Sequence, residues 1–95
     1  MKSITAHFDI SPQGMLCDGT LSFGDGVITV TLEGNTKKFN IDGIKEAVQY
    51  TDVGCGHLEL VPEGGNPDGS DNIHICRFSM SNVTEIGEFT KVINH

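Results

Sequence analysis

Two short segments hold the residues best suited to chemistry. Cys55-Gly56-His57 and His74-Ile75-Cys76 each place a thiol and an imidazole two positions apart, and residues two apart on a β-strand share a face. If the segments form a hairpin centred near residues 65–66, Cys55 lies opposite Cys76 and His57 lies opposite His74. Directly opposite residues are close enough for their side chains to meet. Two thiolates and two imidazoles in such a square could close a tetrahedral Zn²⁺ site.

The same register pairs Leu58 with Ile73, so one apolar side chain faces another. A Cys55–Cys76 disulfide is a geometric alternative under oxidising conditions. The spacing of a cysteine and a histidine two apart differs from that of common zinc motifs, and a flat sheet face rarely wraps four ligands around an ion. The simpler interpretation is two half-buried thiols and two surface imidazoles. Zinc is therefore the alternative, and no cofactor is the primary expectation.

Other candidate residues are explained more simply. Cys17 and His7 have no Asn or Asp placed to complete a nucleophile–base pair, so an enzyme is the least supported hypothesis. Each of four aspartates precedes a glycine, as turns prefer. The loop 66–72 contains several oxygen ligands but lacks the closing Glu of a calcium-binding loop. The sequence therefore predicts no catalytic residue.

Bulk composition excludes several classes of partner. The chain has 95 residues, enough for one domain, and 13 acidic residues against 6 basic ones give a formal charge of −7. An acidic surface disfavours nucleic acid, whose phosphates are bound by Lys and Arg. No apolar stretch is long enough to span a bilayer, and the first ten residues do not resemble a signal peptide. Three cysteines without an export signal indicate a reducing, cytoplasmic location.

Alternating apolar and polar residues predict a series of antiparallel strands. The expected strands cover residues 4–10, 15–23 with a bend or bulge near Asp18-Gly19, 27–33 and 36–41. Turns centred on residues 25–26 and 34–35 place Leu21 opposite Val30 and Val30 opposite Phe39. Every inward residue then meets another inward residue, as a three-strand meander requires.

The second half of the chain predicts further strands and one helix. Residues 44–50 fit a short strand or a helical turn, and strands are expected at 54–61 and 73–80 around a long polar loop. From residue 82 to 95 the period becomes helical, with an apolar stripe formed by Val83, Ile86, Phe89, Val92 and Ile93. Ser81 or Asn82 is the expected N-cap, with Glu85 closing a capping box. Because no helix stop is present, a longer parent protein is expected, of which this is the N-terminal part.

Six or seven antiparallel strands followed by one amphipathic helix resemble pleckstrin-homology-like (PH-like) domains. The segments 26–30, 39–44 and 73–78 look like those of small bacterial members, and the resemblance covers residues 13–95. It implies an antiparallel barrel capped by the helix, and a domain that binds proteins or lipids. Phosphoinositide-binding members have Lys and Arg in an early loop, whereas loops 11–14 and 24–26 hold no cation here. Phosphoinositide binding is therefore not expected.

These observations lead to three functional hypotheses. The first is a non-enzymatic protein-interaction or regulatory module, which uses exposed strand edges or the open end of the barrel. Its partner is a protein or another domain of the same chain. The second is a zinc-binding or thiol redox domain built on Cys55, His57, His74 and Cys76. The third is a small enzyme, for which the sequence provides no nucleophile–base pair.

Overall fold

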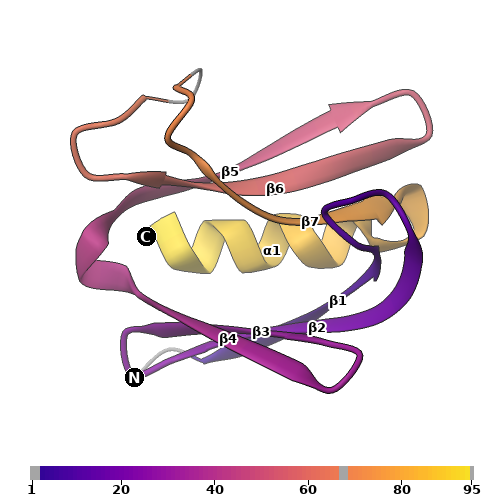
Figure 1. Ribbon diagram of the computed structural model, residues 1–95, viewed down its shortest axis with the longest axis horizontal. Helices are drawn as coiled ribbons and strands as arrows, with labels where there is room; N and C mark the ends of the chain where they lie inside the picture. The colour runs from indigo at the N-terminus through magenta and orange to yellow at the C-terminus, as the bar shows by residue number, and fades with distance from the viewer. Residues whose placement is uncertain (1–2, 67–68, 95) are drawn as a thin grey trace.

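The computed structural model describes residues 3–66 and 69–94, which form seven β-strands and one C-terminal helix (Figure 1). The predicted class, mainly β with a single C-terminal α-helix, is confirmed. No helix in these two ranges is long and apolar enough to cross a membrane. The elements in chain order are β1 (Ile4–Ile10), β2 (Leu16–Gly24), β3 (Val27–Leu32), β4 (Asn35–Asn40), η1 (Ile41–Gly43), β5 (Ile44–Asp52), β6 (Cys55–Pro62), β7 (Ile73–Ser79), η2 (Met80–Asn82) and α1 (Val83–Asn94).

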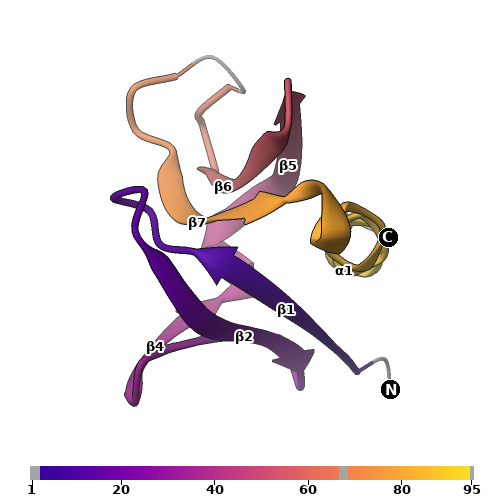
Figure 2. The ribbon, with the colours of Figure 1, turned by 90° about the vertical axis from the view of Figure 1, so that its right-hand side faces the viewer.

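All seven strands belong to one antiparallel sheet in the order β4-β3-β2-β1-β7-β6-β5. The sheet does not close into a hydrogen-bonded barrel, so β4 and β5 remain edge strands. Among the described strands, the two meanders β1–β4 and β5–β7 are joined in the sheet where β1 pairs with β7, through Ile10 and Arg77. They diverge from that seam, and α1 lies between them (Figures 1 and 2).

The predicted register is confirmed in one hairpin and wrong in the next. Leu21 lies opposite Val30, as predicted. In the β3–β4 hairpin, however, Val30 lies opposite Lys37 instead of Phe39. The turn uses Glu33 and Gly34, both at positive φ (50° and 87°), instead of residues 34–35. The slip of two residues keeps each side chain on its predicted face, which is why alternation alone could not detect it.

The β6–β7 register is also wrong, and here the error changes the faces. Cys55 lies opposite Ser79, His57 opposite Arg77 and Leu58 opposite Cys76, with an irregularity before Glu59 pairs with His74. A bulge shifts side chains from one face to the other. The irregularity expected near Asp18-Gly19 is confirmed as a register shift between β1 and β2. Residues 44–50, left open between strand and helix, belong to β5.

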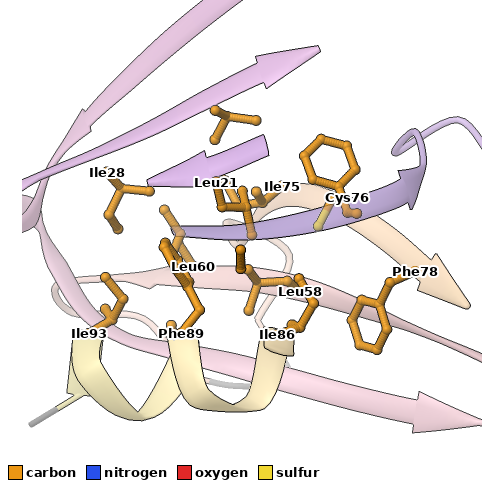
Figure 3. Close-up of a cluster of buried hydrophobic side chains, with 14 of the residues drawn as sticks. Leu21, Ile28, Leu58, Leu60, Ile75, Cys76, Phe78, Ile86, Phe89 and Ile93 are labelled. Carbon is orange, nitrogen blue, oxygen red and sulfur yellow. The ribbon is translucent and has the colours of Figure 1, made fainter. Parts of the chain in front are cut away.

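The apolar stripe of α1 fills the space between the two meanders. Ile86, Phe89 and Ile93 are its buried residues, and they point toward core side chains of both meanders, such as Leu21 and Leu60 (Figure 3). Val83 packs at the margin of this core. The helix is preceded by η2, and Glu85 Oε2 lies 2.9 Å from His7 Nδ1 on β1 instead of closing the predicted capping box. The stripe is therefore the main contact of the helix with the sheet.

Two glycines allow phenylalanine rings to lie flat on the neighbouring strand. A Cβ on Gly19 would come within 2.1 Å of the Phe8 ring, and one on Gly56 within 2.7 Å of the Phe78 ring. Each glycine is the cross-strand partner of its phenylalanine. Phe8 and Phe78 are almost completely buried. A close approach of this kind explains a glycine inside a strand.

The seam between the meanders is reinforced by Asp9. The Ser79 N–H donates to Asp9 Oδ1 at 2.8 Å, and the Ser79 hydroxyl donates to Asp9 Oδ2 at 2.6 Å. Ser79 ends β7 and caps η2, so one carboxylate from β1 fixes both the seam and the approach to α1. Burial raises the pKa of Asp9, but the hydrogen bonds from Ser79 and Asn82 outweigh it and hold the pKa below the ordinary aspartate value.

We expect Asp9→Ala to lower the free energy of unfolding at neutral pH by about 1–3 kcal/mol, because two hydrogen bonds to a charged acceptor are lost. A carboxyl whose pKa is depressed in the folded state contributes stability above its unfolded-state pKa and loses it as pH falls through the folded-state pKa. The difference in the free energy of unfolding between the wild type and Asp9→Ala should therefore be at its maximum above about pH 5 and should shrink below about pH 4. Urea unfolding at a series of pH values measures it.

Asp71→Ala, which removes an exposed loop carboxylate, is the matched control and should change stability little at any pH. A loss in Asp9→Ala that stayed constant down to about pH 2 would show that the carboxylate charge does not stabilise the seam.

Candidate functional site

The structure does not bring the four residues of the predicted zinc square together. His57 and His74 come together on the outer face of the second meander, where their rings stack with centroids 5.4 Å apart. Cys55 is exposed at the beginning of β6, whereas Cys76 belongs to the hydrophobic core. The predicted pairing of Cys55 with Cys76 is therefore wrong, because the bulge in the hairpin turns Cys76 inward.

The three thiols occupy different environments. Burial raises the pKa of the Cys76 thiol far above its ordinary value. Burial also raises the pKa of Cys17, with a further contribution from the carboxylates of Glu33 and Asp18. Thiolates are the reactive and metal-binding form of cysteine, so neither position favours that chemistry. Cys17 is partly buried and packs against the core.

A carboxylate that the sequence analysis did not select joins the two histidines. Glu59 Oε2 lies 2.8 Å from His74 Nε2 and 3.1 Å from His57 Nε2. Tyr50 on β5 stacks on His57 with ring centroids 4.8 Å apart. One outer face of β5–β6–β7 thus holds a continuous polar and aromatic cluster of Tyr50, His57, Glu59 and His74, which we call the histidine cluster.

Burial makes Glu59 the centre of the histidine cluster. Its side chain is only 11% exposed, and a buried carboxylate requires hydrogen-bonding partners. The Asn72 amide donates to Glu59 Oε1 at 3.1 Å, which ties the end of the β6–β7 loop to the sheet. In residues 3–66 and 69–94, no group of three or more His, Cys, Asp or Glu side chains is arranged to hold a metal ion. The Asn72–Glu59 hydrogen bond therefore connects the histidine cluster to this loop.

A cleft lies beside the histidine cluster and shares His74 with it. It has a volume of about 670 Å³ and lies where β3 and β4 of the first meander face the beginning of β7. Its apolar lining consists of Pro12, Val30, Leu32, Phe39, Ile73 and Ile75. A volume of this size is in the range of ligand-binding pockets, which are mostly apolar with a few polar groups. The cleft can therefore accept apolar side chains.

Polar residues surround this apolar lining. Gln13 comes from the β1–β2 loop, Asn35, Thr36 and Lys37 from β4, and His74 from β7. No local sequence pattern predicts the cleft, because its two walls are about 40 residues apart in the chain and are brought together by the sheet order. Alternation predicted Phe39 as an inward residue, which was the one available signal.

The two edges of the sheet differ in accessibility. On β5, the Ala47 N–H donates to the Asn94 side-chain oxygen, and the Asn94 amide donates to the Ala47 carbonyl, both at 2.7 Å. Asn94 therefore makes the pair of hydrogen bonds that a neighbouring strand would make. On β4, every residue except Phe39 is exposed, and the strand pairs with β3 alone among the described strands.

The loop 66–72, for which the sequence predicts no calcium site, falls partly outside the described residues, since Pro67 and Asp68 are not among them. Within the described part, the Asn72 side-chain amide donates a hydrogen bond to the Glu59 carboxylate.

Comparison with known proteins does not assign the chain to a family. No protein-family model, no curated protein and no solved structure matches it. The case for a function therefore depends on the geometry of the chain itself.

We expect Asn94→Ala to open the β5 edge. Loss of both hydrogen bonds should lower the free energy of unfolding by about 1–2 kcal/mol. It should also accelerate hydrogen exchange of the Ala47 amide more than that of other β5 amides. Exchange measured by NMR tests this directly, with Glu88→Ala, an exposed position on the same helix, as the control. Unchanged exchange at Ala47 would show that Asn94 does not protect this edge.

Proposed function

We propose that the chain is a non-enzymatic protein-interaction or regulatory module with a PH-like architecture. It binds a partner protein, or another domain of its own polypeptide, by taking apolar side chains into the cleft between β3–β4 and β7. The observation that carries this proposal is the cleft of about 670 Å³ with its six apolar lining residues. An apolar cleft next to an available strand edge suits a partner that docks in extended form.

The strand order also supports a PH-like architecture. Two antiparallel meanders joined at β1 and β7, with one C-terminal helix packed between them, agree with the resemblance seen in the sequence. Fold likeness alone is a weak basis for function, so the proposal rests on the cleft. A reducing, cytoplasmic location fits the separation of Cys55 from Cys76, which leaves no disulfide between them.

An NMR titration tests whether the cleft binds apolar side chains. The probe is a terminally blocked, neutral peptide, Thr-Leu-Thr-Gln-Thr-Leu-Thr, whose leucines and glutamine share one face when it is extended. We expect chemical-shift changes centred on Val30, Leu32, Phe39 and Ile75, with a dissociation constant in the range of about 0.1–1 mM because the contact is small.

Two variants on opposite faces of β3 sharpen the test. Leu32→Asp places a carboxylate in the apolar lining and should weaken binding by about tenfold or more. Thr29→Asp makes the same change in charge on the opposite face of the strand, across from Lys38, which does not line the cleft, and should leave binding nearly unchanged. Shift changes located away from the cleft, or equal effects of both variants, would contradict the proposal.

A further inference from the structure

The cleft differs in charge from the rest of the molecule. The chain has 13 acidic residues and a formal charge of −7, yet none of the described residues that line the cleft is Asp or Glu. The lining residues with an ionisable side chain are Lys37 and His74. His74 Nε2 is already 2.8 Å from Glu59 Oε2. Lys37 is therefore the side chain that gives the cleft its local positive charge.

The register of β4 places Lys37 at the wall of the cleft. Lys37 lies directly opposite Val30, a core residue that also lines the cleft, and Phe39 follows two positions later on the same face. Lys38, the next residue, points to the other face and is not part of the lining. In residues 3–66 and 69–94 the structure gives Lys37 no carboxylate partner within ion-pair distance. An exposed ammonium group beside an apolar cavity suits an incoming carboxylate.

The free edge of β4 adds a backbone element to this site. A partner segment that extends the sheet at β4 would place alternate side chains on the cleft side. A side chain opposite Lys37 then faces the ammonium group, and its neighbours two positions away face the apolar lining. A partner segment cannot pair with β5 at Ala47 in this way, because Asn94 already makes hydrogen bonds with the Ala47 backbone.

We propose that the partner of this site is an extended acidic segment of a protein, with one carboxylate between two apolar side chains on the same face. The segment pairs with β4, its apolar side chains enter the cleft, and its carboxylate meets Lys37. This inference rests on the proposed function, since it specifies the partner of the same cleft. The net charge of −7 repels an acidic peptide, so nonspecific electrostatic attraction would not produce the proposed binding.

The test compares the neutral peptide with its acidic counterpart, Thr-Leu-Thr-Glu-Thr-Leu-Thr, at about 150 mM salt, where charges beyond about 8 Å are screened. We expect the acidic peptide to bind about threefold to fivefold more tightly, as one exposed ion pair allows. Lys37→Glu should reverse this preference, so that the neutral peptide binds more tightly. Lys38→Glu makes the identical change in charge on the other face and should keep the preference for the acidic peptide.

The outcomes separate the inference from the function on which it rests. Equal binding of both peptides at the cleft, unaffected by Lys37→Glu, overturns the acidic partner and leaves apolar docking standing. A preference lost equally in Lys37→Glu and Lys38→Glu overturns the role of Lys37 and indicates general electrostatics. Binding of neither peptide at the cleft overturns both proposals. Because each readout is a ratio of two affinities for the same variant, a small loss of stability does not imitate the result.

Discussion

The structure depends on the narrow seam between two antiparallel meanders. β1 and β7 pair through Ile10 and Arg77, and the Asp9 carboxylate reinforces this contact through two hydrogen bonds from Ser79. A seam this narrow cannot hold the two meanders at a fixed angle by sheet hydrogen bonds alone. The buried stripe of α1 supplies the missing contact, since Ile86, Phe89 and Ile93 fill the space between the meanders. Asp9 connects the seam with the helix, because its hydrogen-bond partner Ser79 also leads into the helix.

The same arrangement determines where a partner can bind. The helix fills one part of the space between the meanders, and its Asn94 occupies the backbone groups of Ala47 on the β5 edge. The cleft beside β4 stays open, with an apolar lining and Lys37 at its wall. Unpaired strand edges invite association, and proteins commonly block them. Here one edge is blocked by a side chain, while the other adjoins a cavity, which gives the two edges different roles.

Sequence reasoning succeeded where side-chain periodicity was sufficient. The period-two pattern of β3 and the period-3.6 stripe from Val83 to Ile93 both predicted elements that the structure contains. It failed where a single inserted residue mattered, because the bulge in the β6–β7 hairpin sends Cys76 into the core and away from Cys55. Glu59 was overlooked although it stands two positions after His57, since an alternating strand gives no indication that a carboxylate is buried. The cleft required the sheet order, which no local pattern contains.

Backbone hydrogen exchange of β4, with and without the acidic peptide at saturation, tests the central claim most directly. If a partner strand pairs with this edge beside the cleft, the β4 amides that point away from β3 should become protected, and β5 should not change. Protection confined to β4 and accompanied by shifts at Phe39 is the predicted result. Protection that appears on β5 instead, or none on β4 while the peptide is bound, would contradict the assignment of this edge and its cleft as the docking site.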